Sequence, residues 1–171
     1  MIFVTVGSML PFNRLVETMD DWAARHPETE LICQIGEGTY EPKHMQWVRM
    51  VNNTEFLGYV SAAELIVAHA GTGSVFSALE YGKPIVLVPR YADTKEHTTD
   101  HQLHTANWLR GRQGVVIAER SDDIDLRINE ARGMSSATGD FSRHAPADFI
   151  ASIRAAVMDM PPPRRSKGLS E

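Results

Sequence analysis

The stretch LIVAHAGTGSVFSALE, residues 65–80, decides the fold class of this chain. Residues 65–68 form a short apolar run, which is typical of a buried strand. Gly71 and Gly73 then interrupt the pattern, and the apolar positions that follow recur at helical spacing. The stretch therefore predicts a strand, a glycine turn, and a helix that begins near Gly73 or Ser74. Parallel sheets with helices on both faces are built from such units.

The rest of the chain repeats this alternation of strand and helix. Short apolar runs predict strands at residues 2–6, 31–35, 55–57, 84–89 and 115–118. Helical spacing begins at Leu15, and further helices are predicted over residues 73–81, 99–109, 123–132 and 147–158. The alternation predicts an α/β fold with a parallel sheet and helices on both faces.

Size and charge limit the function classes. The chain has 171 residues, and a two-domain nucleotide-fold enzyme needs about twice that length, so we expect a single domain and not a complete enzyme of that kind. The net charge is −5, from 17 basic and 22 acidic residues, which argues against a nucleic-acid partner. No apolar run approaches the roughly 18 residues that span a bilayer. A single cysteine, Cys33, favours a reducing compartment, and we expect the cytoplasm.

Two segments look less ordered than the rest. Residues 133–143 are poor in apolar side chains and predict a loop. Residues 161–171 contain three consecutive prolines and three cations, and we expect a disordered tail after a domain that spans residues 1–160. The cations could touch an anionic membrane surface, but a solvated tail is the favoured interpretation.

The glycine turn at residues 69–74 is a candidate anion site. In an open parallel sheet such a turn lies at the carboxyl edge of the strands, where ligands bind. Gly71 and Gly73 allow backbone N–H groups to approach an anion at a helix N-terminus, and Ser74 and His69 can add donors. The alternative is a tight turn made for packing, with Ser74 as a helix cap and His69 as a structural histidine.

A second polar segment, residues 90–102, leaves the same edge of the predicted sheet. Glu96, His101 and Gln102 offer the donors and acceptors that bind sugar hydroxyls. The alternative is a solvated loop that caps the following helix.

Several short motifs together carry a resemblance to a known family. They are FVTVGS at residues 3–8, HAGTGS at 69–74, EYGKP at 80–84, PR at 89–90 and HQ at 101–102. The combination resembles the C-terminal, donor-binding half of GT-B glycosyltransferases of family 28 over about residues 1–120. More narrowly, it is similar to the small subunit of split enzymes, such as the soluble subunit of the eukaryotic UDP-GlcNAc transferase of dolichol-linked glycan synthesis and bacterial exopolysaccharide glucuronosyl- and glycosyltransferase subunits.

The resemblance implies a Rossmann-like three-layer domain that binds a UDP-sugar. Gly7 and Ser8 would approach the phosphates or the interdomain cleft, and the backbone of Leu57 would contact uracil. The glycine turn would hold the diphosphate, while His101 and Gln102 would hold the sugar. The full set of expected substrate-binding residues is Gly7, Ser8, Leu57, His69, Ala70, Gly71, Thr72, Gly73, Ser74, Ser77, Glu80, Arg90, Glu96, His101 and Gln102.

One position departs from the family pattern. Where the larger family places a ribose-binding glutamate, this chain has Ser77, and Glu80 follows one helical turn later. Either Ser77 binds the ribose weakly, or Glu80 reaches it, or Glu80 pairs with Lys83.

The resemblance also implies inverting transfer without an essential metal or other cofactor. The Asp123-Ile124-Asp125 triplet lies well past the motifs, so departure of UDP would be assisted by the helix dipole, His69 and Ser74. The general base is expected on a partner subunit, with His97 and Glu96 as candidates if the cleft closes over them.

We therefore expect a membrane-associated partner subunit that binds the acceptor, a lipid-linked sugar, at the inner face of the membrane. Apolar positions of the last helix could dock on that partner or on the sheet of this domain: Phe149, Ile150, Ile153, Ala156 and Val157. A non-catalytic stabiliser of a partner transferase is the alternative, and a nucleotide-sugar epimerase would need more chain. Arg90 and Lys95 give only a faint indication of an acidic donor sugar.

Overall fold

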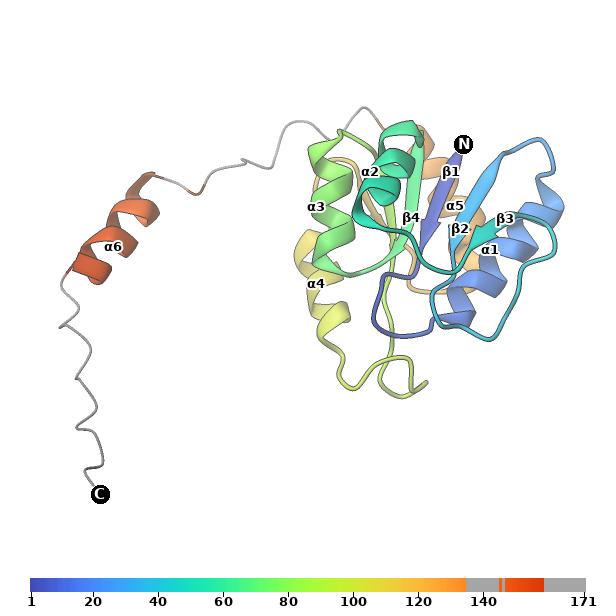
Figure 1. Cartoon of the computed structure of the whole chain (residues 1–171), viewed down its shortest axis with the longest axis horizontal. Helices are drawn as coiled ribbons and strands as arrows, with labels where there is room; N and C mark the ends of the chain where they lie inside the picture. Colours follow the sequence, from blue (N-terminus) through green and yellow to red (C-terminus); the bar gives the residue numbers. More distant parts are fainter. Residues whose placement is uncertain (135–144, 146, 159–171) are drawn as a thin grey trace, which may run out of the picture. The chain divides into compact units, whose positions relative to one another are not determined.

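The computed structural model describes residues 1–134, 145 and 147–158, and it divides the chain into two compact units, Met1–Asp140 and Phe141–Glu171. The second unit contains one described helix, α6 (Ala147–Met158), as predicted. The first unit contains the sheet (Figure 1). Most of the predicted loop at 133–143, the domain limit at 160 and the predicted tail lie outside the described residues.

The first unit is built on a six-stranded, fully parallel sheet with the order β3-β2-β1-β4-β5-β6. The strands are β1 (Ile2–Thr5), β2 (Leu31–Gln34), β3 (Gln46–Val48), β4 (Leu65–His69), β5 (Ile85–Val88) and β6 (Val115–Ile117). The chain first runs outward from β1 to β3, then returns to β4 on the other side of β1 and runs outward again. The order in which strands are added to the sheet therefore reverses between β1 and β4. These two parallel strands pair in register from Ile2↔Leu65 to Thr5↔Ala68.

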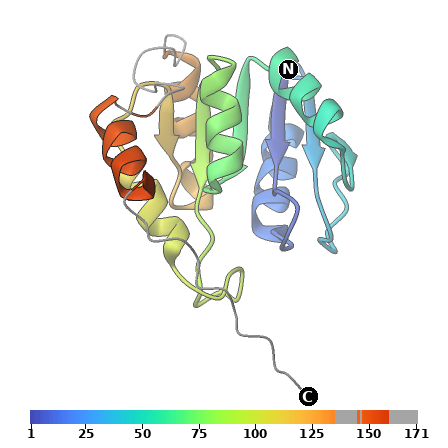
Figure 2. The same ribbon diagram turned by 60° about the vertical axis from the view of Figure 1, so that its left-hand side comes forward.

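Helices cover both faces of the sheet (Figure 2). One face carries α1 (Asn13–Arg25) and α5 (Ile124–Arg132), which follows a short 3-10 turn at Ser121–Asp123. The other face carries α2 (Asn53–Ala62), α3 (Thr72–Glu80) and α4 (His101–Leu109). This arrangement confirms the predicted Rossmann-like three-layer fold with a parallel sheet.

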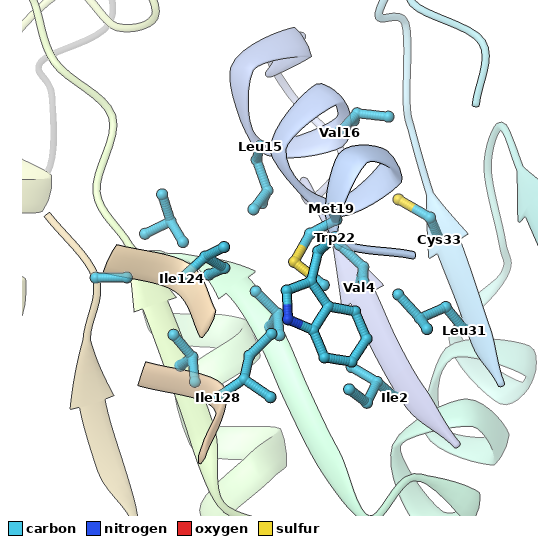
Figure 3. Close-up of a cluster of buried hydrophobic side chains, with 14 of the residues drawn as sticks. Ile2, Val4, Leu15, Val16, Met19, Trp22, Leu31, Cys33, Ile124 and Ile128 are labelled. Carbon is cyan, nitrogen blue, oxygen red and sulfur yellow. The ribbon is translucent and has the colours of Figure 1, made fainter. Parts of the chain in front are cut away.

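The main core lies between the sheet and the α1/α5 layer (Figure 3). Trp22 of α1 is almost fully buried, with Ile128 of α5 and Ile2 of β1 in the same cluster. Burying a large apolar side chain contributes about 2 kcal/mol or more, so α1 is anchored by its apolar stripe. On the opposite face, Phe3 stacks on Tyr59 of α2 with ring centroids 5.2 Å apart.

One strand prediction is wrong, and one strand of the sheet was not predicted. Residues 55–57 do not form a strand, because they lie inside α2. Asn52 and Glu55 form a capping box there: Asn52 Oδ1 accepts from the Glu55 N–H, and Glu55 Oε2 accepts from the Asn52 N–H, each at 3.0 Å. Such reciprocal caps start helices, so the local signal outweighs the short apolar run. The third strand of the sheet, β3, was not predicted, since it is short and only partly buried.

Helix boundaries differ slightly from the sequence predictions. Helix α3 begins at Thr72, before the predicted Gly73 or Ser74, and α4 begins at His101, two residues after the predicted start. Helix α5 begins at Ile124 instead of residue 123.

Candidate functional site

A pocket of about 680 Å³ opens at the carboxyl edge of the sheet. Its walls come from the turn after β1, the end of β4 with the start of α3, the start of α2, and the segment from β5 into α4. It lies where the strand order reverses, which is the position that open α/β sheets use for ligands. The predicted site residues that line it are Gly7, Ser8, His69, Ala70, Gly71, Thr72, Gly73, Ser74, Ser77, Arg90, His101 and Gln102.

The N-terminus of α3 is open toward the pocket. Gly71 is the N-cap residue and supplies no side-chain hydrogen bond, and the first helical bond runs from Val75 N to Gly71 O at 3.3 Å. The N–H groups of Thr72, Gly73 and Ser74 precede that bond, so the helix itself offers them no acceptor. A Cβ on Gly73 would meet nothing within 4 Å. Helix ends of this kind attract anions, because their amides and the helix dipole both favour negative charge.

The ring of His69 lies between two glycines. A Cβ on Gly71 would stand 2.1 Å from Nε2 of His69, and a Cβ on Gly7 would stand 2.5 Å from its Cε1. Gly7 also has a φ of +78°, which favours glycine in its own right. A side chain at position 7 or 71 would therefore collide with the ring of His69, so both positions need glycine. Gly73, in contrast, faces open space in the pocket.

His69 is held in its neutral form. The pKa of His69 is lowered to about 4, mainly by burial and also by the positive charge of Arg90, while the backbone of Thr5 opposes the shift. Within the described residues, the buried Nδ1 has no hydrogen bond of standard geometry, despite the nearby Thr5 backbone. A neutral imidazole keeps one N–H donor and one acceptor nitrogen, so His69 can donate to a phosphate oxygen without changing charge.

Arg90 is buried in the wall of the pocket, with only 2% of its surface exposed to solvent. Its Nη2 donates to the carbonyl oxygens of Val6 at 2.8 Å and Leu10 at 2.6 Å, and its guanidinium lies over the ring of Phe12. Burial lowers the pKa of Arg90 to about 10, with Glu96 acting in the opposite direction, so the side chain remains charged at neutral pH. Arg90 thus brings a buried positive charge to the pocket.

The segment that leads into α4 brings two histidines and an amide to the pocket. The rings of His97 and His101 meet edge to face at 4.3 Å between centroids. Burial lowers the pKa of His97, and the neighbouring His101 and Arg90 add to the shift. Gln102 Oε1 accepts a hydrogen bond from the backbone N–H of Arg90 at 3.2 Å, which ties the start of α4 to the end of β5.

Three predicted site residues do not line the pocket. Leu57 is half-buried in α2, where helix geometry engages its backbone N–H in the bond ladder. Glu80 is exposed at the last position of α3, whereas Ser77 lines the pocket. Glu96 forms a bidentate ion pair with Arg14, at 2.7 and 2.9 Å, and also accepts from the Tyr91 N–H.

The sequence prediction missed the wall that β2 and α2 provide. Gln34 accepts a hydrogen bond from Thr5 Oγ1 at 2.7 Å, and Thr5 Oγ1 accepts from the Gly7 N–H at 3.1 Å. The capping-box pattern at Asn52 and Glu55 was the signal that could have revealed the start of α2. The lining residues absent from the predicted set are Val6, Met9, Leu10, Gln34, Val51, Asn52, Asn53, Phe56, His97 and Thr105.

Two kinds of feature are absent from the part of the chain that the structure describes. None of the helices that the structure describes is long and apolar enough to cross a membrane. Across the same part of the chain, no group of three or more His, Cys, Asp or Glu residues is placed to hold a metal ion.

Solved structures share the fold at low sequence identity. The glycotransferase of kitacinnamycin superposes with a TM-score of 0.58 at 21% identity, over 77% of this chain and 34% of that one. The solution structure of ALG13 superposes with a TM-score of 0.56 at 16% identity, over 89% of this chain and 93% of that one. These likenesses confirm the expected fold, that of the C-terminal half of a GT-B glycosyltransferase.

Sequence comparison identifies relatives and the family. The UDP-N-acetylglucosamine transferase subunit ALG13 of Yarrowia lipolytica is 26% identical over 141 residues, which cover 72% of this chain and 67% of that protein. UDP-glucuronosyltransferase 3A1 of Xenopus laevis is 31% identical over 105 residues, 54% of this chain and only 19% of that protein. The model of the glycosyltransferase family 28 C-terminal domain matches residues 1–124. With the pocket at the strand-order reversal and the open end of α3, this match establishes that the chain belongs to the glycosyltransferase family 28 C-terminal domain family.

Proposed function

We propose that the chain is the donor-binding subunit of a two-subunit inverting glycosyltransferase, and that its pocket binds a UDP-sugar. The observation that carries this proposal is the uncapped start of α3, which faces the pocket beside a neutral histidine and a buried arginine. A diphosphate suits that arrangement because it is anionic and accepts several hydrogen bonds at once.

The diphosphate is assigned to the start of α3. The N–H groups of Thr72, Gly73 and Ser74 donate to its oxygens, and the N–H of His69 adds a donor from the end of β4. When the bond to the sugar breaks, negative charge grows on the departing UDP. Donors that are already in place stabilise that charge without reorganisation, which lowers the barrier to transfer. In this assignment no essential metal ion or other cofactor takes part.

The nucleoside is assigned to the α2 side of the pocket and the sugar to the α4 side. Phe56 and Asn52 line the α2 side and replace Leu57 in this proposal, because Leu57 stands outside the pocket. Ser77, which faces the pocket, is the candidate for the ribose in preference to Glu80. His101 and Gln102 remain the candidates for the sugar hydroxyls.

The proton acceptor is assigned to a partner subunit. Glu96 forms an ion pair with Arg14. Burial alone would raise the pKa of the Glu96 carboxyl, but the hydrogen bonds from Arg14 and the Tyr91 backbone lower it below its ordinary value. A general base must accept a proton from the acceptor hydroxyl, and a carboxylate already held in an ion pair does this poorly. We therefore assign the base to a membrane-associated subunit that also holds a lipid-linked acceptor.

Two observations support the partner proposal. The relative from Yarrowia lipolytica is itself named as a transferase subunit. Helix α6 carries apolar side chains at helical spacing, including Phe149, Ile153 and Val157, which suit a protein surface on that partner. Through the partner the chain would act at the inner face of the membrane, in exopolysaccharide or glycan biosynthesis.

Calorimetric titration of the full chain with UDP, UDP-sugars and ADP tests the donor assignment. We expect UDP and UDP-sugars to bind and ADP to bind at least tenfold more weakly. Sugar transfer to a lipid-linked acceptor should be negligible with the chain alone and should appear when the partner is added. Absence of any UDP binding would favour the stabiliser alternative, and robust turnover by the isolated chain would refute the two-subunit proposal.

A further inference from the structure

Arg90 is the point at which three walls of the pocket meet. Its side chain binds the carbonyl oxygens of Val6 and Leu10, on either side of the turn after β1. Its backbone N–H is held by Gln102 of α4, and Arg90 itself follows β5. Through its side chain and its backbone, this one residue therefore fixes the β1 turn relative to the segment that leads into α4.

The charge of Arg90 lacks a carboxylate partner within the described residues. Glu96, the acidic residue that influences it, is paired with Arg14 instead. In the same part of the chain, the buried Nε of Arg90 has no hydrogen-bond partner. A buried cation without an ion pair is costly, and an anion in the adjacent pocket would relieve that cost.

Arg90 also acts on His69. Its positive charge disfavours a second positive charge on the imidazole, and His97 acts in the same direction. Glu96, the carboxylate that acts on Arg90, is held by Arg14 in an ion pair. The charged and titratable groups around the imidazole are therefore Arg90 and His97, with the Arg14–Glu96 pair and His101 beyond them.

We propose that Arg90 is a positioning residue of the diphosphate site, which holds the turn after β1 against the pocket and sets the electrostatic field at His69. The inference deepens the proposed function and rests on it for the identity of the ligand. Arg90 itself need not touch the donor. Its first role acts through the backbone of residues 6–10, and its second extends to lower pH the range over which His69 remains a neutral donor.

Three variants of the full chain separate these roles. Arg90→Met removes the charge and the hydrogen bonds but keeps an extended side chain. Arg90→Lys keeps the charge but cannot reproduce the planar fork of donors. Arg120→Met is the control, because it removes the same charge from a side chain that is 73% exposed and pairs with Asp122.

The first measurement is ring NMR of His69 against pH in the ligand-free protein. We expect the pKa of His69 to rise in Arg90→Met, without reaching its ordinary value because burial is the larger cause. It should stay low in Arg90→Lys and in Arg120→Met. An unchanged pKa in Arg90→Met, or an equal rise in Arg90→Lys, would overturn the electrostatic role.

The second measurement is amide hydrogen exchange of residues 6–10 and Phe12, since Pro11 has no amide hydrogen. We expect exchange there to accelerate about tenfold in Arg90→Met and less in Arg90→Lys, since lysine can still reach one carbonyl. Unchanged exchange in Arg90→Lys would overturn the positional role. If Arg90→Met fails to fold, Arg90→Lys still tests the positional role, because it retains the buried charge.

The third measurement is UDP-glucose affinity at about pH 7.5 and about pH 5.5, where the charge of this diphosphate diester is constant. We expect Arg90→Met to bind about tenfold more weakly at the higher pH and to recover part of the loss at the lower pH, as His69 gains a proton. An equal loss of UDP-glucose affinity at both pH values would overturn the electrostatic role of Arg90 and leave only its structural role. If the unaltered chain binds no UDP-sugar, the proposed function fails, while the NMR and exchange results still test Arg90.

Discussion

Helices α2 and α3 both begin at the pocket, and of these two only α2 has a side-chain cap. At α2, Asn52 and Glu55 satisfy each other's backbone N–H groups. At α3, the N-cap is Gly71, which has no side chain to offer. An N-cap side chain contributes about 1 kcal/mol to stability, and α3 forgoes it.

The two helix starts differ in role: the start of α2 contributes to stability, and the start of α3 is available to a ligand. At the start of α2, the N–H groups of Asn52 and Glu55 are occupied by the capping box, so this end serves as a wall of the pocket. The amides of Thr72, Gly73 and Ser74 remain open, so this end can take a ligand. An open helix end is most useful where a negative group replaces the missing cap.

The largest effect is expected when a carboxylate closes the open end of α3. In Gly73→Glu the new Cβ meets nothing within 4 Å, and the side chain starts in the first turn of α3. There it competes with the diphosphate for the same amides and repels it. We expect UDP-sugar affinity to fall about a thousandfold, or ~4 kcal/mol, with no loss of stability, as measured by calorimetry and by urea unfolding.

Gly58→Glu is the matched control for this charge. Gly58 is exposed in α2, and a Cβ there also meets nothing within 4 Å. The same added charge should leave donor affinity within a factor of about three. If both variants bind equally well, the start of α3 is not the diphosphate site.

The open end also lies beside a buried histidine, so it should respond to pH. The pKa of His69 is about 4 in the folded chain, against about 6.5 when exposed. Between these values the unfolded chain binds a proton that the folded chain does not, so stability falls as the pH drops. The loss should approach about 3 kcal/mol near pH 4, as measured by urea unfolding at a series of pH values.

Variants of two histidines test whether His69 causes this slope, the fall in the free energy of unfolding as the pH drops. His69→Asn should remove most of it, whereas His104→Gln, which changes an exposed residue of α4, should retain it. A slope that survives in His69→Asn would assign the pH dependence to other groups.

A third test compares two glycines at the start of α3. In Gly71→Ala the Cβ would stand 2.1 Å from Nε2 of His69, so the ring or the backbone must move. We expect a loss of about 2 kcal/mol in the free energy of unfolding. Gly73→Ala, which meets no neighbour, should be as stable as the unaltered chain or more so. Equal stability of the two variants would show that the ring is free to move.

The smallest effect is expected at the capped end. Asn52→Ala removes the oxygen that accepts from the Glu55 N–H, and thermal unfolding should report a loss of about 1 kcal/mol. Asn52→Asp keeps an acceptor oxygen and should retain the stability. If Asn52→Ala unfolds like the unaltered chain, the cap does not stabilise α2 and the contrast with α3 disappears.

Sequence reasoning succeeded where the pattern is local and strong. The run LIVAHAGTGS predicted the strand, turn and helix of the site, because β-branched residues, glycines and helical spacing each act over a few residues. It failed at residues 55–57, where a capping box outweighs an apolar run, and at β3, whose few residues pair with β2 at the edge of the sheet. Short, partly buried edge strands leave little periodicity to detect.

The division of roles among the site residues could not be found in the sequence. Gly71 and Gly73 look equivalent there, yet one accommodates the ring of His69 and the other faces open space. Glu96 looks like a sugar ligand but is held by Arg14 of α1, which is distant in sequence. Such assignments depend on which side chains the fold brings together.

The sequence by itself determined the α/β class, the family resemblance and the strand, turn and helix at residues 65–80, because these follow from local periodicity and short motifs. Only the tertiary structure decided that β1 and β4 meet where the strand order reverses, that α2 supplies a wall of the pocket, and that Arg90 joins the β1 turn to α4. The physical reason is that these are long-range contacts, and their partners become neighbours only when parallel strands are packed in one particular order.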